Sequence, residues 1–211
     1  MSITLILIIM TGLISYQAFY NPEMRAKLLF LPTSIKYSKE WYRFISGGLI
    51  HADWGHLVIN MMVLYQFGEF AESMFNTIFD PLTGRLVYLF FYLSAIVVAS
   101  FPSYLRHQNN YAYAALGASG ATSALVFAFI LFNPWQWFLF PPLPAILFGV
   151  AYLFYSSYMD KRGGDRIGHY EHFWGAVYGL AFMLFIAFFV KPGLLSFFIS
   201  QLMDGPRAFG S

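Results

Sequence analysis

Long apolar stretches alternate with short polar segments along the whole chain. The apolar stretches cover about residues 2–20, 54–75, 82–102, 117–132, 143–159 and 170–190. Proline in Asn-Pro, Asp-Pro and Lys-Pro-Gly junctions between them suits the ends of helices. A hydrocarbon core about 30 Å thick needs about 20 mostly apolar residues for each helical crossing. The pattern therefore predicts six membrane-spanning helices.

The segment 21–53 departs from this alternation, because it is too long for a tight connection. It combines Tyr and Trp residues with five Lys or Arg, and amphipathic aromatic side chains favour the membrane–water boundary. We expect this first loop to be structured and to lie partly in the interface. The apolar tail 194–202 is expected to lie at the interface as well.

Composition supports a membrane protein. The chain is 59% hydrophobic and 10% charged, whereas soluble domains carry about 25% charged residues. We therefore expect one all-α, polytopic membrane domain over residues 1–211. A net charge of +2 without a basic cluster argues against a nucleic-acid partner.

The absence of cysteine excludes disulfides, thiolate metal sites and a cysteine nucleophile. We expect neither a metal nor a cofactor. Residues 1–20 lack the basic start and small-residue cleavage site of a signal peptide, so they are interpreted as a retained first span. The short chain without targeting extensions favours a prokaryotic plasma membrane.

The second apolar segment carries polar residues at membrane depth, where such residues are costly and are candidates for function. His56 and Asn60 are four residues apart, so both project from one face of a helix. They could be oxyanion donors, or polar clamps that hold two helices together.

Small residues open the fourth segment, in the run Gly117-Ala118-Ser119-Gly120-Ala121. Ser119 is expected near a helix N-terminus, where free N–H groups and the dipole favour developing negative charge. An ordinary packing serine is the alternative. The Gly-x-Ser-x-Gly elbow of α/β-hydrolases is excluded, because position 121 is Ala and no strand precedes the helix.

The sixth segment carries His172, Gly175 and Gly179 along one helical stripe. The two glycines would allow close approach of another helix. If that helix is the fourth, His172 can reach Ser119. A serine nucleophile needs an adjacent base, usually His, and donors for the oxyanion, which His56 and Asn60 could supply.

In these residues the chain resembles the rhomboid family of intramembrane serine proteases. The matching residues, in order, are Arg43, His51, His56, Asn60, Phe67, Gly68, Glu72, Gly117, Ala118, Ser119, Gly120, His172, Gly175 and Gly179. The resemblance implies a six-helix bundle and an endopeptidase that cleaves single-span membrane proteins in the bilayer.

The same resemblance implies a role for each residue. Ser119 would be the nucleophile and His172 the general base, in a dyad without an acidic member. His56 and Asn60 would donate to the oxyanion beside the Ser119 N–H, in a site that Gly117 and Ala118 help to line. Arg43 and His51 would brace the first loop, and Glu72 would anchor the second span, while Gly120, Gly175 and Gly179 belong to the structural motif.

Two departures from the family pattern stand beside the catalytic positions. Many rhomboids carry Tyr beneath the catalytic His ring, where this chain has Ser123, so another contact would have to orient His172. Glu171 replaces a small residue, and it could either perturb the pKa of His172 or simply face water.

Charge and family disagree about orientation. Loops one, three and five hold nine of the twelve Lys and Arg, which would put them in the cytoplasm, whereas the family topology puts them outside and both termini inside. We follow the family.

Two other functions compete with a protease. Inactive rhomboid relatives bind or escort membrane clients, although these typically lose the Ser or the His. A transporter or channel would find thin support in Glu69 and Glu72, the acidic residues inside a span.

Overall fold

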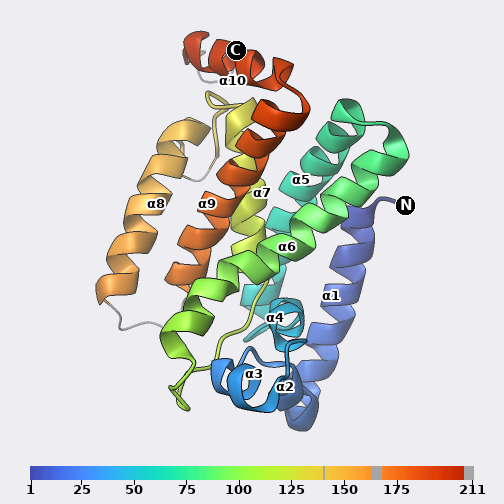
Figure 1. Cartoon of the computed structure of the whole chain (residues 1–211), viewed down its shortest axis with the longest axis vertical. Coiled ribbons are helices and arrows are strands. Elements are labelled where there is room, and N and C mark those ends of the chain that lie inside the picture. The colour runs from blue at the N-terminus through green and yellow to red at the C-terminus, as the bar shows by residue number, and fades with distance from the viewer. Residues whose placement is uncertain (140, 163–167, 207–211) are drawn as a thin grey trace.

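The computed structural model describes residues 1–139, 141–162 and 168–206, and the regular secondary structure of these residues is helical throughout (Figure 1). The helices are α1 Ile3–Tyr20, α2 Pro22–Leu28, α3 Pro32–Ser38, α4 Arg43–Ser46, the 3₁₀ turn η1 Gly47–Leu49, α5 Trp54–Ile78, α6 Pro81–His107, α7 Ser119–Phe132, α8 Ala145–Arg162, α9 His169–Phe185, the π-helical turn η2 Ile186–Val190 and α10 Gly193–Met203. The predicted all-α fold is confirmed.

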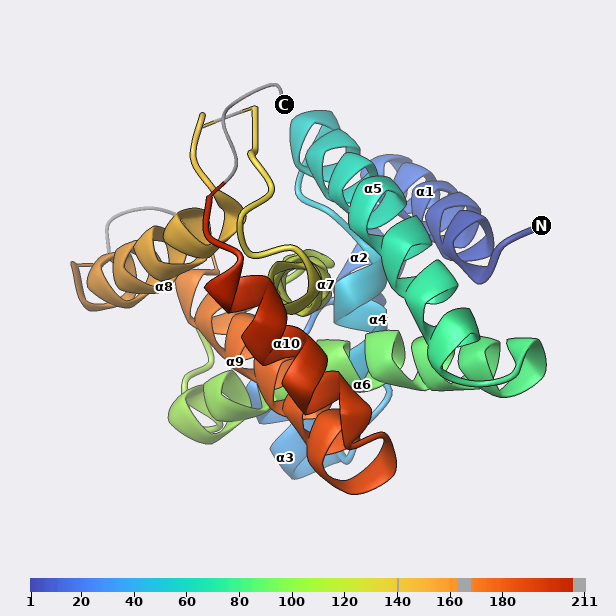
Figure 2. The same ribbon diagram turned by 90° about the horizontal axis from the view of Figure 1, so that it is seen from above.

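Helix α7 is the centre of the bundle. Viewed from above, it is surrounded by α5, α6, α9 and α10, while α1 and α8 lie at the outside (Figure 2). Most α7 side chains from Gly120 to Ile130 are buried, and they are predominantly small in the first two turns. Small side chains let neighbouring helices approach a central helix from several sides.

By length and hydropathy, three of the described helical segments could cross a membrane: Ile3–Tyr20, Pro81–His107 and His169–Val190. Helix α7 has 14 residues, which span only about 21 Å at 1.5 Å per residue. A helix this short can lie inside the membrane, because neighbouring helices cover it and the unpaired backbone groups at its ends need not contact lipid. Six crossings remain a prediction.

The third apolar segment extends further than predicted. The predicted stretch ends at about residue 102, but α6 contains Pro102 and continues to His107. Proline removes one helical hydrogen bond, yet the next turn is held by other contacts. Ser103 is fully buried, and Arg106 donates to both carboxylate oxygens of Asp160 on α8 at 2.9 Å.

The first loop contains α2, α3, α4 and η1, which cluster at one end of the bundle (Figure 1). Arg43 is buried in it and donates to the carbonyls of Ala26 and Leu29 at 3.0 and 2.8 Å. It also forms an ion pair with Glu40. One guanidinium therefore joins α4 to the end of α2.

Glu72 on α5 binds the start of α1. Its carboxylate accepts the backbone N–H groups of Ile3 and Thr4, both at 2.9 Å, and the Thr4 hydroxyl at 3.0 Å. Glu69 binds Ser2 at the same helix end. Carboxylates satisfy free N–H groups at a helix N-terminus and complement its dipole. These contacts give both acidic residues a structural role.

Candidate active site

The peptide that leads into α7 is pinned to the first loop. Ala115 and Phe30 exchange two backbone hydrogen bonds at 3.1 Å, and the Gly117 N–H donates to the Gly47 carbonyl at 2.9 Å. Gly117 has a φ of 117°, which L side chains rarely adopt. A Cβ there would lie 2.7 Å from Cε1 of His56. Position 117 therefore requires glycine for backbone conformation and for space.

His51 links this peptide to α1. Its Nε2 accepts the Ala118 N–H at 3.4 Å, and its Nδ1 lies 3.0 Å from the Ser15 hydroxyl. Ser15 also donates to the Leu49 carbonyl at 3.0 Å. Because the serine proton is used there, Nδ1 carries the imidazole proton and donates to Ser15. Burial, with a smaller effect of His56, lowers the pKa of His51 to about 3, so the ring is neutral.

His56 and Asn60 both lie beside the first turn of α7. The backbone N–H of His56 donates to Asp53, which caps α5, at 2.9 Å, and the His56 ring stands against Gly117. The Asn60 amide donates to the His56 carbonyl at 2.9 Å and accepts the Thr122 hydroxyl at 3.3 Å. The pair is thus held at the start of α7, one turn from Ser119.

Helices α7 and α9 lie side by side in both ribbon views (Figures 1 and 2), and glycine makes this possible. A Cβ at Gly175 would lie 2.0 Å from the Gly120 carbonyl oxygen, and one at Gly179 would lie 2.3 Å from that of Ala124. Ser119 directly precedes Gly120, and His172 is one turn before Gly175. The backbone contact therefore brings these two residues to the same level of the bundle.

Tyr152 on α8 provides an aromatic contact for His172, and position 123 carries Ser. Its ring is stacked on the His172 ring, with centroids 6.1 Å apart and planes 21° apart. Its hydroxyl is 2.6 Å from the Ser123 hydroxyl, which lies 2.8 Å from the Ser119 carbonyl oxygen. Sequence reasoning missed Tyr152, although it lies on the stripe that α8 turns toward its neighbours.

Glu171 is a hydrogen-bonded link to the third loop. Its carboxylate accepts the Ser103 hydroxyl of α6 at 2.5 Å and the Tyr113 hydroxyl of the loop at 2.8 Å. Burial, reinforced by this carboxylate, raises the pKa of Tyr113, so the phenol remains a donor. The His107 ring is stacked on Tyr113 with centroids 3.8 Å apart. The expectation that Glu171 simply faces water is therefore wrong.

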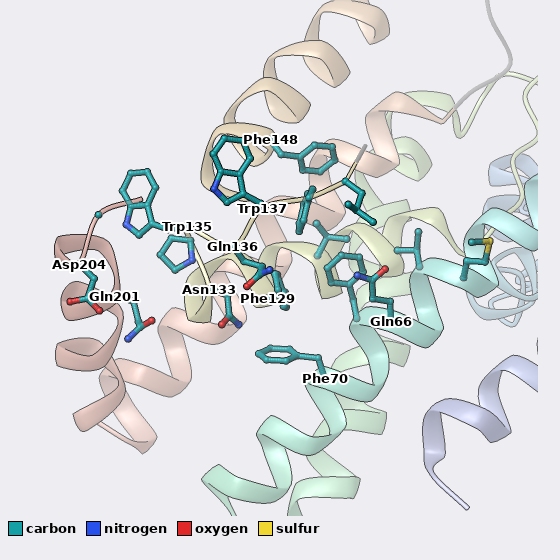
Figure 3. A pocket seen from close by; sticks show the side chains of 18 of the residues that line it. Gln66, Phe70, Phe129, Asn133, Trp135, Gln136, Trp137, Phe148, Gln201 and Asp204 are labelled. Carbon is teal, nitrogen blue, oxygen red and sulfur yellow. The ribbon is translucent and has the colours of Figure 1, made fainter. Parts of the chain in front are cut away.

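A separate groove of about 1270 Å³ opens between α5 and the start of α8, where the connection after α7 and the end of α10 cover it (Figure 3). Phe70, Phe129 and Phe148 are among its aromatic lining residues, and Gln66 and Asn133 are among its polar ones. Phe129 is ten residues beyond Ser119 on α7, which is about 15 Å along the helix. The predicted catalytic residues lie outside this lining.

Within the described part of the chain, no three His, Asp or Glu side chains converge as metal ligands would. The residues around the start of α7 carry hydroxyl, imidazole and N–H groups.

A family model, the Rhomboid domain, matches residues 38–189. This is well over half of the chain, and the chain therefore belongs to the rhomboid family and is an integral, multi-pass membrane protein.

Three relatives are similar over part of their length. Rhomboid-like protein 11, chloroplastic, from Arabidopsis thaliana is 32% identical over 98 residues, covering 46% of this chain and 31% of that protein. RHOMBOID-like protein 12, mitochondrial, from the same plant is 28% identical over 147 residues, covering 64% and 43%. Putative rhomboid protease YdcA from Bacillus subtilis (strain 168) is 29% identical over 86 residues, covering 41% and 38%. The chain thus spans less than half the length of each.

These relatives bear on the expected location. Two are named for the chloroplast and the mitochondrion, and one is bacterial. The comparisons do not support the expectation of a prokaryotic plasma membrane, because the names of two of these relatives assign them to plant organelles.

Proposed function

We propose that this rhomboid-family member is an intramembrane serine endopeptidase that cleaves single-span membrane proteins with a Ser119–His172 dyad. The observation that carries the proposal is the glycine contact between α7 and α9. Gly175 and Gly179 lie against the backbone of Gly120 and Ala124. This contact supports the proposal that the Ser119 hydroxyl and the His172 imidazole lie at the same level of the bundle.

In the proposed reaction, Ser119 Oγ attacks a peptide carbonyl while His172 accepts the hydroxyl proton. His172 then gives this proton to the departing amine, which leaves an ester on Ser119. His172 next takes a proton from water, the resulting hydroxide attacks the ester carbonyl, and His172 returns the proton to Ser119 Oγ as the bond to the acyl group breaks.

Donors beside α7 would stabilise the negative oxygen of each tetrahedral intermediate. His56 Nδ1 accepts the Ala52 N–H at 3.5 Å, so the other nitrogen, Nε2, carries the proton in the neutral ring. Cε1 and this Nε2 are the ring atoms nearest to a Cβ placed at Gly117, at 2.7 and 3.0 Å. The second N–H of the Asn60 amide and the Ser119 backbone N–H would complete the donor set.

The groove beyond the dyad supports an elongated membrane substrate. It is lined by large apolar side chains with amide groups between them, as would suit a helix that is partly unwound at the end nearer Ser119. The small residues Gly117, Ala118 and Gly120 favour a small substrate residue before the scissile bond. Replacing that substrate residue by bulky ones is expected to stop cleavage.

The decisive experiment compares wild type, Ser119→Ala and His172→Ala in proteoliposomes with a model single-span substrate. Cleavage is expected to fall to background in both variants, by several orders of magnitude. A fluorophosphonate should label wild type and fail to label either variant. Labelling that survives the loss of His172 would contradict an activated serine.

The same assay separates the enzyme from an inactive binding or escort protein. Such a protein would retain the substrate in the membrane without cutting it, and Ser119→Ala would then equal wild type. Equal cleavage by wild type and Ser119→Ala would exclude the proposed mechanism.

A further inference from the structure

Tyr152 lies on the one face that α8 turns to the bundle. Within the described residues of α8, the buried positions are Ala145, Gly149 and Ser156, and Tyr152 is half-buried on the same stripe. Gly149 brings the helix close to α7, since a Cβ there would lie 2.9 Å from Ile130. This approach allows a side chain of α8 to reach past α7 to α9.

The Tyr152 ring is fixed by aromatic contacts on several sides. Its centroid is 5.9 Å from that of Phe127, 5.8 Å from that of Phe148 and 6.1 Å from that of His172. The small angle between the Tyr152 and His172 planes makes the contact with the imidazole a stacked one. An aromatic surface at this place limits how far the imidazole can turn about its side-chain bonds.

The hydroxyl of Tyr152 has a defined direction of donation. Ser123 has a single hydroxyl proton, and its oxygen lies 2.8 Å from the Ser119 carbonyl, which can only accept. Ser123 therefore donates to Ser119, and Tyr152 donates to Ser123 across 2.6 Å. The tyrosine is thus tied to the helical turn that carries the nucleophile, while its ring lies on the base.

We infer that Tyr152 and Ser123 together form a positioning device that sets the His172 ring toward Ser119. The inference rests on the proposed protease function and deepens it. The rhomboid resemblance implies a tyrosine beneath the catalytic ring, and position 123, where it would be expected, is Ser. Here the ring comes from α8, and Ser123 provides the hydrogen bond that holds it.

The physical consequence concerns the geometry of proton transfer. A general base works when its nitrogen is about 2.6–3.2 Å from the oxygen whose proton it accepts, and a displacement near 1 Å can cost on the order of 100-fold in rate. Tyr152 does not touch the substrate in this scheme, and it acts only through the position of the His172 ring. Its loss should therefore lower kcat and leave KM almost unchanged.

The test uses the full-length protein in proteoliposomes with four variants: Tyr152→Leu, Tyr152→Phe, Ser123→Ala and the double variant Tyr152→Phe with Ser123→Ala. Tyr152→Leu removes the ring, and kcat should fall on the order of 10- to 100-fold. Tyr152→Phe and Ser123→Ala each remove the hydrogen bond between the two hydroxyls, so kcat should fall severalfold in each, and Ser123→Ala also loses the hydrogen bond to the Ser119 carbonyl. The double variant should resemble Ser123→Ala, because the bond that Tyr152→Phe removes is already absent there.

Tyr158→Leu is the matched control, since Tyr158 lies on the same helix with 60% of its surface exposed, and its kcat should equal that of wild type. The acid limb of the pH profile of kcat/KM should shift in Tyr152→Leu and stay in place in Tyr158→Leu. A rescue variant that combines Tyr152→Leu with Ser123→Tyr should recover kcat.

The outcomes separate the two proposals. If Tyr152→Leu has the kcat and the pH profile of wild type while Ser119→Ala is inactive, the positioning role is overturned and the protease function is retained. Cleavage by Ser119→Ala would overturn both. The rate of fluorophosphonate labelling, measured on monodisperse protein, distinguishes a misaligned from a misfolded Tyr152→Leu protein. If this variant has a lower melting temperature but the labelling rate of wild type, the inference is overturned as well.

Discussion

The role of His51 follows from the hydrogen bonds of its two ring nitrogens. One nitrogen accepts from Ala118, just before Ser119, and the other donates to Ser15 on α1. A protonated ring would have a second donor facing the Ala118 N–H. The fully buried ring therefore has to remain neutral to hold the peptide that precedes the nucleophile.

This neutrality predicts acid sensitivity with a definite sign. The pKa of His51 is about 3 in the folded protein and 6.5 in its ordinary state, so the unfolded chain binds more protons between these values. The stabilising contribution is complete above pH 6.5 and is lost as pH falls, by about 2 kcal/mol between pH 7 and pH 5. His51→Gln should be less stable at pH 7 and should lose less stability toward pH 5.

Reversible unfolding in mixed micelles, followed by tryptophan fluorescence at several pH values, measures both profiles. The difference between wild type and His51→Gln isolates the contribution of this ring, because the other acidic and basic groups are shared. Parallel profiles would show that His51 takes up no extra proton on unfolding.

At the scale of helices, the contact between α7 and α9 depends on backbone meeting backbone. Any side chain at Gly175 must push the helices apart, because the atom it meets is a carbonyl oxygen at 2.0 Å. Gly175→Ala should therefore lower the free energy of unfolding by about 1–3 kcal/mol. The cleavage rate should fall by more than the loss of folded protein explains, because the separation of the helices moves His172 away from Ser119.

Gly12→Ala on α1 is the control, because a Cβ there meets nothing within 4 Å. Alanine in an open helical position stabilises by up to about 1 kcal/mol. Thermal unfolding in detergent and substrate cleavage should be measured for both variants. A Gly175→Ala protein as stable and active as Gly12→Ala would refute the close contact.

At the scale of the molecule, the prediction concerns the two ends of the bundle. Helices α2–α4 lie at one end, and α10 lies at the other (Figure 1). Since the sequence contains no cysteine, single cysteines report position without interference. Tyr37 in α3 and Met203 in α10 are 57% and 81% exposed, which suits both for labelling.

A membrane-impermeant maleimide added to intact cells should label Tyr37→Cys and not Met203→Cys, as the rhomboid topology requires. After lysis it should label both variants equally. The reversed pattern would mean that the distribution of Lys and Arg determines orientation in this chain, and labelling of both in intact cells would contradict opposite ends.

The apolar pattern placed the main helices well, because lipid forces each spanning segment to satisfy its own backbone. Spacing also predicted that His56 shares a helical face with Asn60, and His172 with Gly175, because helical periodicity determines which residues share a face. The helix continues five residues beyond the predicted stretch of about 82–102 and includes Pro102, because contacts of Ser103 and Arg106 hold the turn after this proline.

The sequence by itself determined the all-helical class and the short set of polar residues worth testing, because both follow from periodicity and from the cost of polar groups in lipid. Only the tertiary structure decided which side chains meet. Tyr152 reaches His172, and Glu171 binds Tyr113, through contacts between segments far apart in the chain. Such pairings depend on how helices rotate and approach one another, and local spacing carries no record of that.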